Sequence, residues 1–177
     1  QHIIEPQTKP ASEWIAGRVV QKVSPSQRHA NAQARIISAL VSWSDNFERG
    51  RVGTEWEFRI APPGEVARSL VPDVAFLSYE KIPPEDDRAA QYPQTAPDAA
   101  FEVLSPSDRA SNVAEKIRVY LLSGTGVVAM VDPDRRSVAL HDAAGIRTLK
   151  EGDILEHPSL PNFAMPVADI FAKSGQR

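Results

Sequence analysis

Two acidic side chains interrupt segments of this sequence that are otherwise apolar. Asp73 stands near the start of the run VPDVAFL (71–77), and Glu102 stands in the middle of AAFEVL (99–104). A carboxylate in a buried strand is costly unless it is paired, hydrogen-bonded or bound to a metal ion. Two such carboxylates on strands could together hold one Mg²⁺ or Mn²⁺, an ion that keeps several waters for a phosphate group.

Each acid also has an ordinary structural interpretation. The position of a lysine bears on the choice between the structural role and the chemical one. Asp73 would cap backbone amides at a turn, and Glu102 would form an internal ion pair. Lys116 lies three residues after Val113 and four before Tyr120, so it borders the apolar stripe of a predicted helix. An ammonium there could orient an attacking water or offset charge on a phosphate in the transition state.

The elements that must position these residues follow from the apolar periodicity. Gly17 marks the turn of a short hairpin, and Gly50 and Gly124 are the expected stops of two helices. The sequence predicts a hairpin at 13–23, helices at 29–47 and 109–122, a loop at 80–97, and strands at 52–60, 70–77, 99–104, 127–131, 137–141 and 146–150.

The strand at 99–104, the helix at 109–122 and the strand at 127–131 form a strand–helix–strand unit. Such a unit is expected to be a right-handed parallel crossover, whereas the other strands are predicted to pair antiparallel. The predicted fold class is therefore α/β (α+β), with a mixed β-sheet flanked by helices. At 177 residues, the whole chain 1–177 is expected to form a single domain.

Composition excludes several classes of protein. The 20 basic and 23 acidic residues give a net charge of −3, so broad electrostatic binding of nucleic acid is not expected. A nucleic-acid substrate would require a local basic surface or divalent cations. The absence of cysteine excludes disulfides and cysteine zinc sites. The longest apolar runs are about six residues, far below the ~20 of a membrane helix, and a cytoplasmic location is expected.

Several strings accompany the candidate residues and resemble one known family. They are EWIAGRVV (13–20), VPDVAF (71–76), PDAAFEVLSPS (97–107), Lys116 with Tyr120, VDP (131–133) and GDIL (152–155). Together they resemble the Uma-two family of restriction endonuclease-like proteins, over about residues 13–171. That family is similar to the PD-(D/E)xK nuclease superfamily, whose core is a mixed sheet flanked by helices.

The resemblance implies a metal-dependent endonuclease that hydrolyses DNA phosphodiester bonds. It implies Asp73, Glu102 and Lys116 as catalytic residues and Asp73, Glu102 and Val103 as ligands of Mg²⁺ or Mn²⁺. The superfamily's usual lysine, two residues after the glutamate, is replaced here by Leu104, and the family pattern moves it to the following helix. A homodimer is expected, because the resemblance suggests one and a DNA duplex presents two strands.

Two other functions remain open at this point. One is a catalytically silent DNA-binding or assembly module on the same scaffold, and the other is a hydrolase of some other phosphoester. Glu55, Glu57 and His29 are peripheral candidates, each with a surface role as the simpler interpretation. Possible phosphate contacts come from four basic residues: Lys22, Arg35, Arg109 and Arg118.

Overall fold

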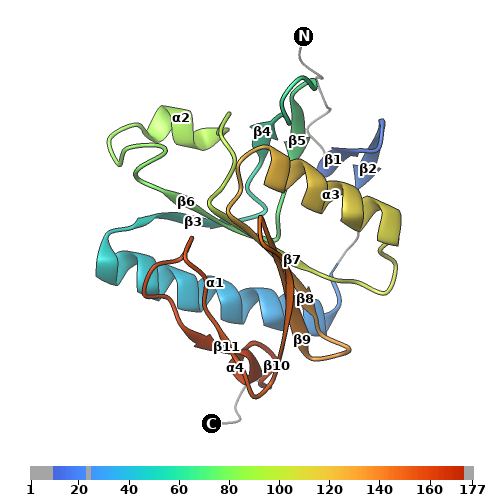
Figure 1. The fold of residues 1–177 in the computed structure, drawn as a ribbon, viewed down its shortest axis with the longest axis vertical. Helices are drawn as coiled ribbons and strands as arrows, with labels where there is room; N and C mark the ends of the chain where they lie inside the picture. The colour runs from blue at the N-terminus through green and yellow to red at the C-terminus, as the bar shows by residue number, and fades with distance from the viewer. Residues whose placement is uncertain (1–9, 23–24, 174–177) are drawn as a thin grey trace.

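A six-stranded mixed sheet forms the centre of the protein (Figure 1). The computed structural model describes residues 10–22 and 25–173. Strands β7 and β8 run parallel, and the other neighbouring strands of this sheet are antiparallel. In order across the sheet, the strands are β10 (Gly145–Lys150), β9 (Ser137–Asp142), β8 (Val127–Asp132), β7 (Ala99–Val103), β6 (Val74–Ser78) and β3 (Gly50–Thr54).

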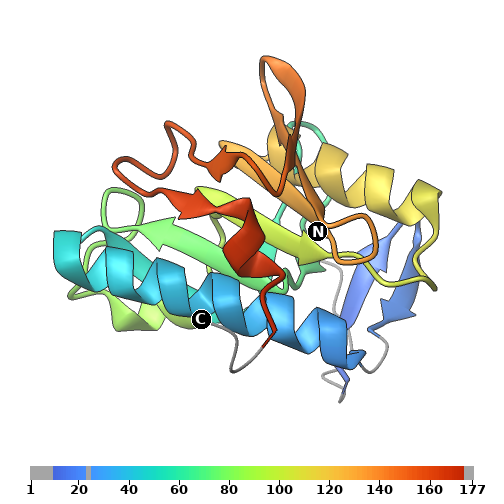
Figure 2. The same ribbon diagram turned by 90° about the horizontal axis from the view of Figure 1, so that it is seen from below.

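Helices and short hairpins cover both faces of this sheet (Figure 2). On one face α1 (Gln27–Phe47) packs beside α4 (Val167–Ile170), close to the short pair β11 (Ile154–Leu155) and β12 (Met165–Pro166). The other face carries α3 (Ala110–Leu122), α2 (Asp87–Gln91) and two hairpins. These hairpins are β1 (Ser12–Ile15) with β2 (Arg18–Gln21), and β4 (Phe58–Ile60) with β5 (Arg68–Leu70). This arrangement confirms the predicted fold class.

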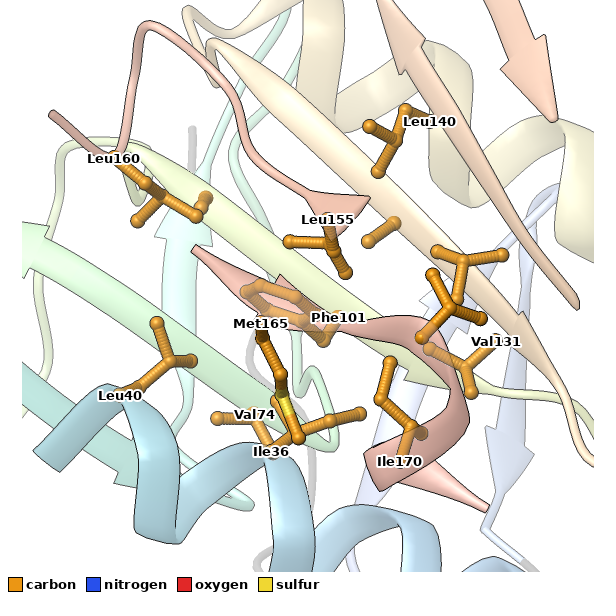
Figure 3. Packing of buried hydrophobic residues seen from close by; sticks show 14 of the residues in the cluster. Ile36, Leu40, Val74, Phe101, Val131, Leu140, Leu155, Leu160, Met165 and Ile170 are labelled. Carbon is orange, nitrogen blue, oxygen red and sulfur yellow. The ribbon is translucent and has the colours of Figure 1, made fainter. Parts of the chain in front are cut away.

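Side chains of the central strands alternate between two apolar clusters. Phe101 of β7 packs in the cluster that contains Ile36 of α1, as Figure 3 shows. Its neighbour Ala100 belongs to the opposite cluster, which contains Tyr120 of α3. Because successive side chains of a strand point to opposite faces, Glu102 lies on the α3 side of the sheet.

The predicted crossover is present. Strand β7 pairs in parallel with β8, from Ala99 opposite Val127 to Val103 opposite Val131. Helix α3 connects the two strands and ends at Leu122, and Gly124 turns the chain with a φ of 101°. This connection lays α3 over the face of β7 that carries Glu102.

The predicted N-terminal hairpin is also present, with Gly17 at its turn, although Val23 lies outside the described residues. Helix α1 begins at Gln27, because the Ser26 hydroxyl accepts a hydrogen bond from the backbone N–H of His29 at 3.3 Å. In the described part of the chain, no helix combines the length and the apolar composition that crossing a membrane requires.

The predicted role of Gly50 as a helix stop is wrong. Helix α1 ends at Phe47, and Glu48 closes it in the left-handed conformation with a φ of 49°. Gly50 already belongs to β3, where a Cβ atom would lie 2.3 Å from the carbonyl oxygen of Leu77. This glycine is therefore required by the close approach of two strands.

Two predicted strands are each divided in the structure. The alternation at 52–60 continues across a break, because Glu55 has a φ of 49° and turns the chain out of the central sheet. The run at 70–77 is likewise shared between β5, which pairs with β4, and β6 of the central sheet. The predicted loop at 80–97 contains the short helix α2, which Asp86 caps through the backbone N–H of Ala89.

Candidate active site

Asp73 and Glu102 lie on the same face of the central sheet. In the antiparallel pair β6–β7, Val74 is opposite Phe101 and Ala75 is opposite Ala100. One further step of this register places Asp73 opposite Glu102, where Cβ atoms are typically about 4.5–5.5 Å apart. Both acids are buried, with 2% and 7% of their surfaces exposed. The structure therefore brings two buried carboxylates together at one end of the sheet.

Asp73 is surrounded by hydrogen-bond donors. Its Oδ1 lies 2.6 Å from the Nζ of Lys22, and its Oδ2 accepts from the backbone N–H of Val103 at 2.7 Å. The Nε2 of His29 is 3.2 Å from the same Oδ2. Burial opposes ionisation, but His29 and Lys22 outweigh it and hold the pKa of Asp73 well below its usual range. The contact with Asp73 in turn raises the pKa of His29.

Glu102 has a different environment, although it lies on the same face. Its Oε1 is 2.7 Å from the Nζ of Lys116 and accepts a hydrogen bond from the Tyr120 hydroxyl at 3.1 Å. Burial raises the pKa of Glu102 to about 7, and the nearby charges of Asp73 and Glu13 add to this effect against the opposing charge of Lys116. The two candidate ligands therefore differ in their affinity for a proton.

Lys116 reaches the sheet from α3, one helical turn before Tyr120. Since residues four apart lie on one face of a helix, both side chains point at Glu102. Lys116 is 9% exposed, and its ammonium lies between Glu102 and Glu13, 2.9 Å from the Oε1 of Glu13. Burial disfavours this charge, but the two carboxylates outweigh burial and raise the pKa of Lys116 above its usual value.

Glu13 belongs to this site, although the sequence analysis did not select it. It is 4% exposed on β1, and its Oε1 accepts the backbone N–H of Val71 at 2.8 Å. The hairpin thereby connects to the segment that precedes Asp73. The sequence signal that could have identified Glu13 was its place in the string EWIAGRVV (13–20). An acid in a short hairpin strand is ordinarily exposed, so this position does not by itself indicate a buried site residue.

The peripheral acids separate into two environments. Glu55 lies 3.0 Å from the Nζ of Lys22, which connects it to Asp73. Burial raises the pKa of Glu55, although its side chain is 45% exposed. Glu57 instead pairs with Arg59 at 3.0 Å and lies away from the two carboxylates. His29, a peripheral candidate for which a surface or capping role is the simpler interpretation, contacts Asp73 directly.

The four basic residues considered for phosphate contacts lie in different parts of the structure. Lys22 and Arg109 line the cavity that holds the carboxylates. Arg118 pairs with Glu65 at 2.7 Å on the outer surface of α3, and Arg35 donates to a backbone carbonyl near the C-terminus. The cavity measures about 420 Å³. Its charged lining consists of Glu13, Arg18, Lys22, His29, Asp73, Glu102, Asp108, Arg109 and Lys116.

The donor atoms at this site suit a hard divalent cation. Asp73 and Glu102 present carboxylate oxygens to the cavity, and Val103 also lines it. Mg²⁺ is typically held by one or two carboxylates and retains waters elsewhere, so a small protein ligand set is sufficient. Within residues 10–22 and 25–173, no three histidine, aspartate or glutamate side chains converge tightly enough to form a complete metal cluster. The Lys22 ammonium, packed against Asp73, marks a place that favours positive charge.

Fold and site together define a nuclease-like protein: a mixed sheet with one parallel crossover carries paired acids and a lysine at one end. The comparisons with known proteins agree. The profile of the Uma2 (Uma-two) family, described as "Putative restriction endonuclease", matches residues 2–168, and the chain belongs to that family.

A solved structure is similar over almost the entire chain. It is the crystal structure of a protein from Anabaena variabilis described as "a putative nuclease belonging to DUF820". The two chains are 27% identical, with a TM-score of 0.82, and the alignment covers 94% of this chain and 93% of that one. Among curated proteins, none matches this chain.

Proposed function

We propose that this protein is a metal-dependent endonuclease that hydrolyses DNA phosphodiester bonds. The observation that carries the proposal is the convergence of two buried carboxylates and a buried ammonium on one cavity, from β6, β7 and α3. Membership of a family described as "Putative restriction endonuclease" supports the same class of reaction.

In this proposal, Asp73 and Glu102 hold a single Mg²⁺ or Mn²⁺, with Val103 contributing its backbone carbonyl. A bound divalent cation lowers the pKa of water and stabilises charge on a phosphoryl oxygen. The hydrogen bonds from Val103 and Tyr120 fix the orientation of the two carboxylates. Such fixed orientation avoids reorganisation during the reaction.

Lys116 would act on the reacting phosphate from the α3 side. Its ammonium is held in place by Glu13 and Glu102, and Lys116 lines the same cavity as the two candidate ligands. Arg18 and Arg109, which line the cavity, would contact neighbouring phosphates of the DNA strand. These contacts supply the local basic surface that a protein of net charge −3 requires.

A catalytically silent DNA-binding or assembly module is the second candidate. Lys22 and Lys116 already pair with Asp73 and Glu102, so the site is internally balanced without any ligand. Binding of DNA without cleavage, in the presence of Mn²⁺, would favour this candidate over the nuclease.

The decisive experiment compares cleavage of supercoiled plasmid DNA by four proteins in Mg²⁺ or Mn²⁺. The wild type should nick the plasmid and lose this activity in EDTA. Asp73→Asn and Glu102→Gln should lower the rate by at least about 10², a typical loss of transition-state stabilisation. Glu57→Gln is the matched control, because this acid lies outside the cavity, and it should cleave normally. Equal rates in all four proteins would contradict the proposed function.

A homodimer would bring one such site to each strand of a duplex. Sedimentation of the protein with and without a short duplex would measure the oligomeric state. Cleavage of a small phosphodiester in preference to DNA would instead indicate a hydrolase of another phosphoester.

A further inference from the structure

The ammonium of Lys22 occupies an all-oxygen environment at the edge of the cavity. Its Nζ lies 2.6 Å from Asp73 Oδ1, 3.0 Å from Glu55 Oε2 and 3.1 Å from the backbone carbonyl oxygen of Val71. Two carboxylates and a carbonyl are the donor types that hard divalent cations prefer. The Lys22 side chain is 17% exposed, so solvent weakens these contacts only in part.

Lys22 contacts the one oxygen of Asp73 that the protein leaves for a cation. Oδ2 is already used by the backbone N–H of Val103 and by His29. A metal ion on Asp73 would therefore bind through Oδ1 and lie next to the ammonium. Like charges at such a separation repel strongly, so a metal ion and Lys22 cannot share this oxygen at low energy.

We propose that Lys22 is an internal cation that holds the Asp73 end of the metal site in the metal-free protein, in direct competition with the divalent metal. The inference rests on the proposed function, because it assumes that Asp73 binds the metal. Lys22 is thus a positioning residue that sets metal affinity. It also keeps Asp73 neutralised beside Glu102 until a metal arrives.

Glu55 offers the displaced ammonium a place to remain. It already contacts Lys22, and its side chain is 45% exposed, so the contact extends toward solvent. The flexible stem of lysine can move its charge several ångströms without any change in the backbone. A released Lys22 would stay paired with Glu55 at the edge of the cavity.

Calorimetric titration with Mn²⁺ tests the competition without any measurement of activity. Lys22→Met should bind Mn²⁺ at least about tenfold more tightly than the wild type, because the competing charge is absent. Lys81→Met is a closely matched control. Lys81 is a partly buried lysine that also contacts a carboxylate (Asp98, 3.3 Å) and backbone carbonyls, but it lies outside this cavity. Its Mn²⁺ affinity should stay within about twofold of the wild type.

Lys22→Arg separates direct competition from a general effect of charge. It also keeps a cation paired with Asp73, so it remains informative if Lys22→Met does not fold. The guanidinium fork can hold a carboxylate through two hydrogen bonds, so this variant should bind Mn²⁺ more weakly than the wild type. Circular dichroism checks the folding of each variant.

Three outcomes are decisive. Tight Mn²⁺ binding by Lys22→Met supports the inference, even if the wild type binds too weakly to detect. Detectable binding by the wild type with no gain in Lys22→Met, or with no loss in Lys22→Arg, overturns the inference and leaves the proposed function intact. No binding by any of these proteins overturns both.

Discussion

Replacing Lys116 with methionine removes the ammonium that two buried carboxylates share. Glu102 and Glu13 lie 2.7 and 2.9 Å from its Nζ and are 7% and 4% exposed, so neither can turn to bulk water for compensation. Removing one partner of a buried ion pair typically costs about 3–5 kcal/mol. For a chain of this size, we expect the Tm to fall by about 6–20 °C.

Urea unfolding at pH 8 in EDTA measures this loss in the metal-free protein. Arg118→Met is the matched control, because it removes the same charge from the same helix. Arg118 pairs with Glu65 and Glu115 on the surface, where its side chain is 39% exposed. Exposed pairs contribute about 0–1 kcal/mol, so this control should be nearly as stable as the wild type.

The pH dependence of the Lys116→Met loss gives a second check. Because the pKa of Glu102 is raised to about 7, this carboxyl is protonated at pH 5 and no longer needs an ammonium partner. The destabilisation should therefore be smaller at pH 5 than at pH 8. If Lys116→Met lowers the free energy of unfolding at pH 8 no more than Arg118→Met does, Lys116 does not form a buried ion pair, and the assignment is refuted.

Three further predictions concern the two candidate ligands. The unfolded chain releases the Glu102 proton near pH 4.5 and the folded protein near pH 7, so metal-free stability should fall across that window. The free energy of unfolding should decrease by at most about 3 kcal/mol, and the Tm measured at successive pH values should fall accordingly. In Glu102→Gln, the Tm should depend less on pH. Asp73→Asn should destabilise the metal-free protein by about 3 kcal/mol in urea unfolding, because Lys22 and His29 lose their anionic partner. Tyr120→Phe should cost about 1 kcal/mol and raise the pH midpoint of the Tm series, because a donor to Glu102 is lost. A Tm that rises with pH between 5 and 7, or unchanged stability in Asp73→Asn, would contradict these assignments.

The sequence by itself determined the core of the fold and three members of the candidate site, Asp73, Glu102 and Lys116. Helix α3 was predictable because it buries one face whose period is local to the helix, and strand β7 because its continuous apolar run is buried on both faces. Glu102 was recognisable for the same reason, since a single acid within a continuous apolar strand requires a partner. Asp73 stood out by the same rule, although the structure places it just before β6.

The local pattern could not show where a regular alternation is broken. Residues 52–60 alternate as one strand would, yet the left-handed conformation of Glu55 divides them between two sheets. The alternation continues after this break because the side chains of Phe58 and Ile60 are buried in the second sheet. Alternation in a sequence indicates that one face of a strand is buried. It does not indicate which element of the fold covers that face.

Only the tertiary structure decided which side chains surround the two acids. Lys22 meets Asp73 across 51 residues of sequence, and Glu13 meets Lys116 across 103. These contacts exist because the N-terminal hairpin packs over the face of the sheet that α3 also covers. Such packing is set by the complementary shapes of distant apolar surfaces. The acids could therefore be found from their own strands, whereas their partners depend on how the whole chain is assembled.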